Sequence, residues 1–295
     1  MNLSLSRSFP IAKAALTGAV IACAVALTCS LTGCASGGTD SSSADADNTS
    51  ASTDGKTLRV AMELAYPPFE TKDDAGNPEG LAVDFIRDFG AAYGYDVQIE
   101  NTAWDGLIPS LQSDKADLVI SSMTITDERK QSVDFSDAYA MAQLAILANA
   151  DSGVASIDDL NQPGKKVAVK TGSTGDVYAT KNLTNAEIVR LADESACVTE
   201  VVQGKADGFL YDQLTIYRNH QANPDTTEAV FIPFQDAEEW GIAVKKGNTE
   251  LLNQLNAFIA QSKTDGEFDR LTEKYLSEDK KAFDQYGFKW FFDFE

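Results

Sequence analysis

The sequence predicts an α/β fold of two lobes that are joined by two crossing segments. The first observation is that β-branched apolar runs alternate with stretches of helical period, once before and once after a polar break at residues 149–153. The second is a pair of apolar segments, 139–148 and 230–235, where the chain would leave the first unit and return to it. The third is length, because 295 residues allow two lobes that each bury a core.

The composition is that of a globular and strongly acidic chain. Hydrophobic residues make up 43% of it, which is enough for packed cores rather than disorder. The formal net charge is −21 and no basic patch is visible, which argues against nucleic acid as a partner. The acidity instead favours solubility.

Residues 1–33 have the pattern of a signal peptide. Arg7 and Lys13 form a basic region, and the apolar core at 14–27 is too short to span a bilayer comfortably. The segment ends in Leu-Thr-Gly-Cys, which resembles the lipobox of bacterial lipoproteins. The resemblance implies that Cys34 is lipidated and anchors the chain to the outer face of the bacterial cell membrane. The alternative is an ordinary signal peptide with an incidental cysteine.

Residues 34–55 form a flexible tether in this interpretation, because beyond Cys34 they include no apolar side chain larger than alanine. Cys23 and Cys29 leave with the signal peptide. Cys197 is then the cysteine left for a folded core, so no internal disulfide is expected. Its apolar surroundings indicate a buried structural thiol.

The first lobe is expected to comprise residues 56–140 and 239–282. Its elements follow from apolar periodicity and from turn-forming residues. In order, we expect strand 57–62, a hairpin turn at 73–78, helix 83–94, strand 95–99, a helix from 104 and strand 118–120, and later strand 240–244 with helices 251–259 and 268–276.

The second lobe is expected to comprise residues 141–238. Residues 283–295 come after the last part of the first lobe and form an aromatic tail. This tail either packs against a lobe as a strand or strap, or it docks a partner. The expected order within the second lobe is helix 156–160, strand 165–170, helix 176–181, strand 187–191, helix 194–204, strand 206–210 and helix 211–220.

A binding site is predicted where the strand at 118–120 ends in small polar residues. In open α/β sheets ligands bind at the carboxyl ends of strands. Arg129 follows, and its planar guanidinium suits a carboxylate held in two places. The alternative is that Arg129 pairs on the surface with Asp127, Glu128 or Asp134.

Further side chains suit the same small ligand. Ser173 and Thr174 open a helix after a strand, so their hydroxyl and N–H groups suit an anion, or they only cap their helix. Asp212 follows a strand and suits a cation such as an α-ammonium, or it is a helix N-cap. Tyr66 and Trp104 would close over the ligand, or they are core aromatics.

An ordered set of motifs resembles the polar amino-acid family of ABC-transporter solute-binding proteins. The fold that this implies is the two-lobed type II periplasmic-binding (Venus-flytrap) architecture, in which hinge motion closes the lobes over a ligand. The resemblance covers residues 57–276. The motifs are Tyr66-Pro-Pro-Phe-Glu, Trp104-Asp-Gly-Leu-Ile-Pro-Ser-Leu, Met123-Thr-Ile-Thr-Asp-Glu-Arg-Lys, Val133-Asp-Phe-Ser-Asp, Val169-Lys-Thr-Gly-Ser-Thr and Gly204-Lys-Ala-Asp.

The resemblance implies a role for individual residues. Arg129 matches the clamp on the ligand α-carboxylate, and Asp212 matches the acceptor of its α-ammonium. One motif departs from the family pattern, because an acid is missing from residues 80–84, which puts only that local structure in doubt. The other implied contacts are Ser122, Met123 and Thr124 at the end of the strand, Ser173 and Thr174 in the second lobe, Tyr66 and Trp104 as aromatic walls, and Glu63 and Lys170 for selectivity.

The ligand side chain depends on Glu63 and Lys170. Glu63 suits a cationic side chain, whereas Lys170 opposes one and is similar to the glutamine-binding members. If both line the pocket they pair and leave a neutral polar environment, so glutamine is preferred slightly over arginine, lysine or histidine. The resemblance further implies a monomer that delivers its amino acid to an ABC permease with its ATPase, and it implies neither a cofactor nor a metal.

Two other functions stay open. Some dehydratases resemble these binding proteins, and an enzyme acting on prephenate or arogenate would need a general acid or base in the cleft. The single histidine, His220, falls at a predicted helix end, and the sequence shows no zinc pattern, P-loop or nucleophile elbow. The other alternative is a sensor module that presents an amino acid to a separate receptor.

Overall fold

The computed structural model describes residues 56–286 and 289–294. The predicted signal peptide, the tether and the lipidation site at Cys34 lie outside the described residues. Within the described ranges, none of the helices combines the length and the apolar character that crossing a membrane requires.

The first sheet is built around β1 (Lys56–Met62). It pairs in parallel with β4 (Tyr95–Asn101) and β5 (Leu118–Val119), as the sequence predicts for this unit. β14 (Ala243–Lys245) lies antiparallel between β5 and β6 (Val133–Phe135), which gives the order β4-β1-β5-β14-β6. A strand from far along the chain therefore completes a sheet that begins at residue 56, and it makes that sheet mixed rather than parallel.

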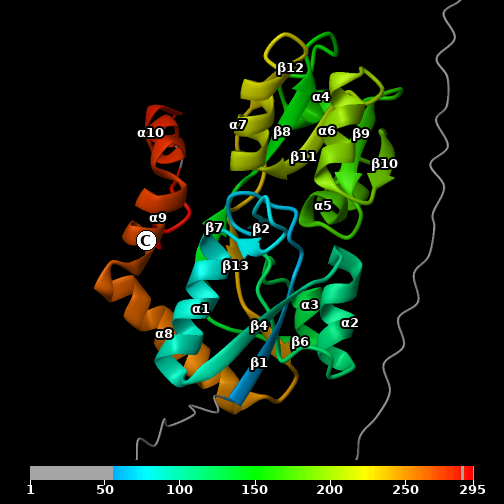
Figure 1. Ribbon diagram of the computed structural model, residues 1–295. Helices are drawn as coiled ribbons and strands as arrows, with labels where there is room; N and C mark the ends of the chain where they lie inside the picture. Colours follow the sequence, from blue (N-terminus) through cyan, green and yellow to red (C-terminus); the bar gives the residue numbers. More distant parts are fainter. Residues whose placement is uncertain (1–55, 287–288, 295) are drawn as a thin grey trace, which may run out of the picture. The chain divides into compact units, whose positions relative to one another are not determined.

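Helices pack against this sheet (Figure 1), and the core between them is rich in aromatic side chains. Phe85 and Phe89 recur at helical spacing on the buried face of α1, which ends at Gly94 in a left-handed cap. Phe85 contacts Phe258 of α8 and Phe268 of α9. The elements of this part are α1 (Leu81–Tyr93), the 3-10 turn Trp104–Gly106, α2 (Leu107–Gln112), α3 (Asp127–Lys130), α8 (Thr249–Asp265), α9 (Glu267–Tyr275) and the short hairpin of β2 (Thr71–Lys72) and β3 (Pro78–Glu79).

The second sheet has the order β10-β9-β11-β8-β12. Strands β10, β9 and β11 are parallel, while β8 runs antiparallel to β11 and β12. The sequence placed residue 230 in the return segment, but β12 keeps the chain in this sheet up to Val230, so the crossing begins after it. The strands are β8 (Leu144–Asn149), β9 (Lys166–Lys170), β10 (Glu187–Leu191), β11 (Gly208–Asp212) and β12 (Thr227–Val230).

Alternate side chains of this sheet enter two separate cores. Leu147 and Phe209 belong to the core that includes Cys197, whereas Ile146 and Leu210 belong to the opposite one. This is the two-residue period of a strand, with both faces buried by helices. Cys197 is a free, buried thiol, as expected. The helices are α4 (Ile157–Leu160), α5 (Thr174–Asn182), α6 (Glu194–Val202) and α7 (Gln213–Ala222).

Two short strands cross between the sheets. β7 (Ala140–Ala142) and β13 (Glu238–Trp240) form an antiparallel ribbon of their own. The single strand expected at 240–244 is therefore wrong, because β13 pairs with β7 while β14 joins the first sheet. The break falls at Gly241, where a Cβ would lie 2.8 Å from the Ile125 side chain, so any larger residue would force that side chain to move.

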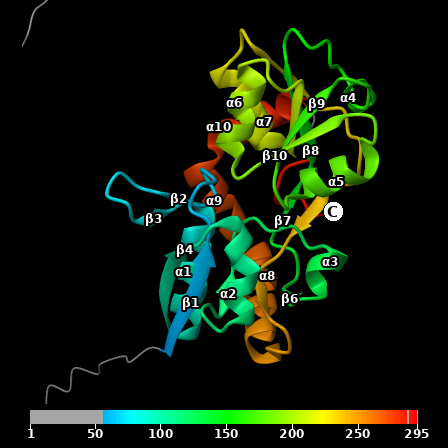
Figure 2. The ribbon, with the colours of Figure 1, turned by 90° about the vertical axis from the view of Figure 1, so that its right-hand side faces the viewer.

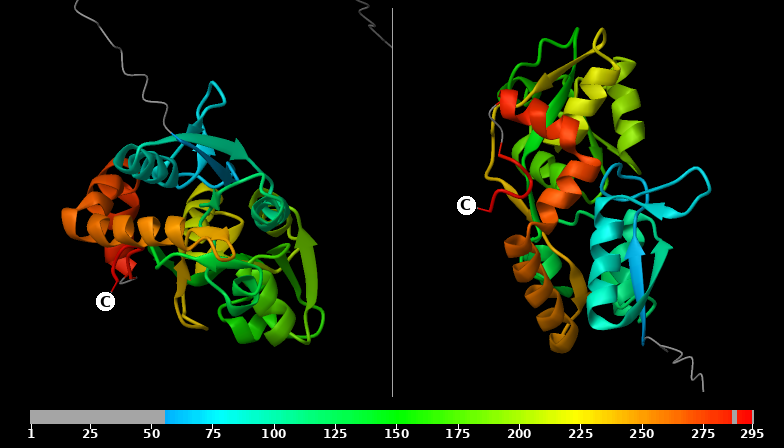
Figure 3. Two further views of the ribbon diagram at one scale, coloured as in Figure 1. Left: turned by 90° about the horizontal axis from the view of Figure 1, so that it is seen from below. Right: turned by 60° about the vertical axis from the view of Figure 1, so that its left-hand side comes forward.

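The carboxyl-terminal segment packs into the core of the first lobe. Of the two expected roles of this segment, the structure shows packing against a lobe. Trp290 and Phe291 are buried there, and Phe291 contacts both Phe69 and Trp240. The Met141 amide in the crossing strand β7 donates a hydrogen bond to the Phe291 carbonyl at 2.7 Å. Figures 2 and 3 show α8, α9 and α10 (Ser277–Tyr286) following one another along one side of the described part.

This segment also reaches the second lobe. Arg218 of α7 holds Asp279 of α10 with two charge-assisted hydrogen bonds, Nε to Oδ1 at 3.0 Å and Nη2 to Oδ2 at 2.6 Å. A planar guanidinium that meets both carboxylate oxygens is the more specific kind of ion pair. The extension beyond α9 therefore contacts helices on both sides of the crossing strands.

We expect Phe291→Ala to lower the free energy of unfolding by about 3–5 kcal/mol, because it leaves a cavity among Phe69, Trp240 and Trp290. Urea denaturation measures the change. The matched control is Val177→Ala, whose side chain is 52% exposed. A loss for Phe291→Ala no larger than that of the control would show that the tail is not part of the folded core.

Candidate ligand-binding site

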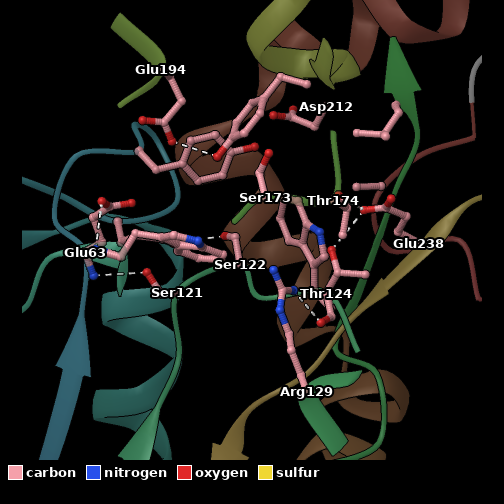
Figure 4. A pocket seen from close by; sticks show the side chains of 17 residues that line it. Glu63, Ser121, Ser122, Thr124, Arg129, Ser173, Thr174, Glu194, Asp212 and Glu238 are labelled. Atoms are coloured by element: carbon pink, nitrogen blue, oxygen red, sulfur yellow. Dashed lines mark hydrogen bonds between the residues drawn. The ribbon is translucent and has the colours of Figure 1, made fainter. Parts of the chain in front are cut away.

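A pocket lies where the two sheets and the crossing strands meet. Its space, counted with the open mouth, is about 490 Å³. Figure 4 shows side chains converging on it from both lobes. The lining residues are Glu63, Tyr66, Glu70, Trp104, Ser121, Ser122, Thr124, Arg129, Ala142, Leu144, Ser173, Thr174, Glu194, Tyr211, Asp212, Glu238 and Trp240.

The predicted contacts, with two exceptions, line this pocket. Met123 is instead buried in the core between α2 and the first sheet. Its neighbours Ser122 and Thr124 line the pocket instead. Lys170 is the second exception, since its side chain is 1% exposed and lies behind the carboxylates that line the wall.

Arg129 enters the pocket from the short helix α3, which Thr126 caps. Its Nη1 donates to the Thr124 carbonyl at 2.7 Å, and its Nη2 donates across to the Gly172 carbonyl of the second lobe at 3.2 Å. The guanidinium carbon lies 5.2 Å from the centre of the Trp104 ring, which is a cation–π contact. Burial lowers the pKa of this guanidinium from its usual value, although an arginine stays charged.

The surface alternative for Arg129 does not hold in the structure. Among the described residues it makes no ion pair with a carboxylate. Two of the acids considered for it pair with lysines instead, Asp127 with Lys130 and Asp134 with Lys246. The arginine is therefore held by neutral carbonyls, and the charge of Glu238 acts on it without forming an ion pair.

Asp212 is both the helix cap and a pocket residue. It is the last residue of β11, and its Oδ1 accepts the amides of Leu214 and Thr215 at 2.9 and 3.1 Å at the start of α7. Its Oδ2 is buried and has no hydrogen-bond partner among the described residues. Burial raises the pKa of this carboxyl. One oxygen thus fixes the side chain, and the other, near the Tyr66 hydroxyl, is available to a cation.

Ser173 and Thr174 divide the two functions that the sequence left open for them. Ser173 Oγ accepts the Asp176 amide at 3.2 Å and caps α5. Thr174 Oγ1 donates instead to Glu238 Oε2 at 2.7 Å. The helix start lies directly against β11, because a Cβ on Gly175 would come within 2.4 Å of the Leu210 carbonyl oxygen.

The aromatic side chains form both wall and core. Tyr66 stacks on Phe69 with 5.3 Å between the ring centroids. It makes edge-to-face contacts with Tyr211 and Trp240, with 6.0 Å between the centroids in each case. Burial and the nearby Asp212 carboxyl raise the pKa of its phenol. The Trp104 ring makes cation–π contacts with two cations. Lys170 Nζ lies 4.9 Å from its ring centre, and the Arg129 guanidinium carbon lies 5.2 Å from it.

Buried charged groups form another part of the pocket wall. Lys170 Nζ donates to the Glu63 carboxylate, which belongs to the first lobe, and to Glu194 Oε1 at 3.0 Å. Tyr211 donates its hydroxyl to the same Glu194 oxygen at 2.7 Å. Burial raises the pKa of Glu63, and the Lys170 ammonium opposes that effect. The expected pair of Glu63 and Lys170 therefore forms, but with a third member.

Several lining residues were missed by the sequence reasoning. Glu194 is the first residue of α6 and gave no signal beyond helix propensity, and Glu238 falls in a segment assigned only as a crossing. Glu70 stood inside a quoted motif and could have been considered. It is 1% exposed and accepts a hydrogen bond from Ser122 Oγ at 3.1 Å. Ser122 has a φ of 48°, which is rare for a residue with a side chain.

Glu70 makes the stability of the fold depend on pH. Burial raises the pKa of its carboxyl well above the ordinary value of 4.5. The folded state therefore binds this proton more tightly than the unfolded chain, and it loses stability as pH rises from about 4.5 toward the raised pKa. Glu70→Gln cannot ionise, so its free energy of unfolding should rise above that of the wild type over this window, by about 1.4 kcal/mol per pH unit at most.

Urea denaturation at a series of pH values measures this difference. Glu79→Gln, at an exposed position of β3, is the matched control and should follow the wild-type profile. Parallel profiles for Glu70→Gln and wild type would contradict a raised pKa at Glu70.

Comparison with known proteins places the chain in a family. Residues 58–278 match the family described as bacterial extracellular solute-binding proteins, family 3. A probable histidine-binding protein of Neisseria gonorrhoeae is 34% identical over 262 residues, which cover 87% of this chain and 95% of that protein. An L-arginine-binding protein of Pseudomonas aeruginosa is 34% identical over 253 residues, covering 79% and 90% of the two chains.

Solved structures agree. An ancestral arginine-binding protein bound to arginine is 36% identical with a TM-score of 0.69, and the match covers 75% of this chain and 98% of that one. An ancestral amino-acid-binding protein that is a precursor of cyclohexadienyl dehydratase is 38% identical with a TM-score of 0.69, covering 75% and 95%. The chain therefore belongs to family 3 of the bacterial extracellular solute-binding proteins, and its two mixed sheets with two crossing strands are the type II fold of that family.

Proposed function

We propose that this protein captures a polar L-amino acid between its lobes and delivers it to an ABC permease with its ATPase. The observation that carries the proposal is the pair of opposite charges in one pocket. Arg129 offers a guanidinium without a carboxylate partner, and Asp212 offers a buried, unpartnered oxygen. A zwitterion satisfies both, which a simple anion or cation does not.

Capture follows from the division of the pocket between the lobes. Arg129 and Trp104 come from the first, and Asp212 and Thr174 come from the second. A ligand that contacts all of them stabilises the closed arrangement by the difference in its affinity for the closed and open forms. A permease that distinguishes the loaded form from the empty one would then receive only loaded protein.

The cluster of Glu63, Lys170 and Glu194 bears on the ligand side chain. The sequence argument for glutamine set Glu63 alone against Lys170. With Glu194 on the same ammonium, two carboxylates against one cation leave one net negative charge on this wall. That charge favours arginine, lysine or histidine, and it places glutamine second. The named ligands of the relatives above, histidine and arginine, accord with this order.

We further propose the organisation that the sequence indicates. Residues 1–33 would be removed as a signal peptide, and lipidated Cys34 would hold a monomer at the outer face of the membrane through the tether 34–55. Lobe 1 would comprise residues 56–140 and 239–282, and lobe 2 would comprise 141–238. Because each sheet draws its strands from one of these sets, the crossing strands would act as the hinge.

An enzyme on the same fold is the second candidate, and Glu70 is the observation that favours it. A buried carboxyl with a raised pKa inside a pocket is the usual form of a general acid. A dehydratase of prephenate or arogenate would use it to protonate a departing hydroxyl. Turnover of either compound by the wild type and its loss in Glu70→Gln would support the enzyme, whereas no turnover would exclude these substrates.

Arg129→Ala should weaken amino-acid binding by about 2–5 kcal/mol, because it removes the cation that holds the ligand carboxylate. Isothermal calorimetry with L-arginine measures the loss. Arg87→Ala is the control, since Arg87 is exposed on α1 and outside the pocket. Unchanged affinity in Arg129→Ala, with the fold intact by circular dichroism, would reject the proposed carboxylate site.

Glu194→Gln should change the order of ligands. Removing one carboxylate from the wall lowers its net negative charge, so affinity for L-arginine and L-lysine should fall relative to L-glutamine. A thermal-shift series over the common amino acids ranks them for both proteins, because a ligand that binds the folded form raises its melting temperature. The same ranking in variant and wild type would show that this cluster does not select the side chain.

A further inference from the structure

Glu238 joins three segments of the chain with one carboxylate. It belongs to the crossing strand β13, and its Oε2 accepts the hydroxyl of Thr124 from the first lobe at 2.9 Å. The same oxygen accepts the hydroxyl of Thr174 from the second lobe at 2.7 Å. Its Oε1 accepts Gln235 Nε2 at 2.6 Å. Figure 4 shows both threonines directed at Glu238 beside Arg129.

Thr124 is a ligand contact that the family resemblance implies, and Thr174 at the start of α5 suits an anion, so a ligand carboxylate at Arg129 would need these same hydroxyls. A hydroxyl has one proton to donate. While Thr124 and Thr174 donate to Glu238, they have no proton left for a second carboxylate. Glu238 and the ligand carboxylate therefore compete for the same two donors.

We propose that Glu238 is an internal stand-in for the ligand carboxylate, which latches Thr124 to Thr174 across the lobes until an incoming carboxylate takes over their hydroxyls. This inference rests on the proposed function, because it places the ligand carboxylate beside Arg129. The inference gives Glu238 a role in regulating both the affinity for the ligand and the closure of the lobes.

The charges around Glu238 support competition rather than cooperation. Burial raises the pKa of the Glu238 carboxyl, whereas the hydrogen bonds from Thr174, Thr124 and Gln235 and the charge of Arg129 oppose this and favour the ionised form. The other ionisable groups in the pocket wall are carboxyls and phenols, namely Glu63, Glu70, Glu194, Asp212, Tyr66 and Tyr211. A ligand carboxylate at Arg129 would thus meet a second negative charge at short range with one shared cation. Like charges in that arrangement disfavour each other.

A simpler role predicts the opposite result. If Glu238 only oriented the two hydroxyls toward a ligand, its replacement would weaken binding. Under competition, its replacement strengthens binding and loosens the lobes when no amino acid is added. Glu238→Gln is the suitable change, because it keeps the size of the side chain and removes the charge.

The first measurement is affinity for L-arginine and L-glutamine by calorimetry. We expect Glu238→Gln to bind about tenfold more tightly than the wild type. Glu239→Gln is the matched control on the same strand, since Glu239 is exposed and lies outside the pocket, and its affinity should stay at the wild-type value. Weaker or unchanged binding by Glu238→Gln would overturn the proposal and leave the residue an orienting role.

The second measurement is hydrogen–deuterium exchange of the three full-length proteins without added amino acid. Peptides that cover 122–130 and 171–178 should exchange faster in Glu238→Gln than in the wild type and in Glu239→Gln. Equal rates would overturn the latch whatever the affinities are. If neither amino acid binds any of the three proteins, the proposed ligand class is wrong, and the exchange rates alone then decide whether Glu238 holds the lobes.

Discussion

The ammonium of Lys170 is almost completely removed from water, and much of the arrangement around the pocket follows from that. A buried charge is tolerated only when partners compensate it, and here one partner, Glu63, comes from the opposite lobe. The other partner, Glu194, lies at the start of α6 and is fixed by Tyr211. The end of β9 and the end of β1 are thereby held facing each other, which brings the polar strand ends of both sheets to one place.

The groups that end strands and begin helices also make the binding surface. Asp212 uses one oxygen for the amides of α7 and leaves the other in the pocket. Thr126 caps α3 and so directs Arg129 toward the carbonyls of Thr124 and Gly172. The alternatives of structural cap and ligand contact are therefore not exclusive. A capping carboxylate has two oxygens, and this fold can use one oxygen for the helix and the other for the pocket.

The crossing strands carry more than the connection between lobes. β13 brings Glu238 to the pocket, while β7 accepts the aromatic tail through the bond from Met141 to the Phe291 carbonyl. The ion pair of Arg218 and Asp279 adds a contact between α10 and the second lobe. Under the proposed hinge motion, opening would have to break contacts of this kind, and the tail would then contribute to the free-energy difference between open and closed forms.

The sequence by itself determined the elements and the residues at their ends. Apolar period located most strands and helices, and the polar ends of strands predicted Arg129 and Asp212, because those signals depend only on neighbours along the chain. Tertiary structure alone decided which charges meet. Glu194 and Glu238 enter the pocket from segments with no local signal, Lys170 turns behind the wall, and residues 240–244 divide between two sheets. Contacts between distant segments depend on how the sheets pack, and periodicity along the chain does not record that packing.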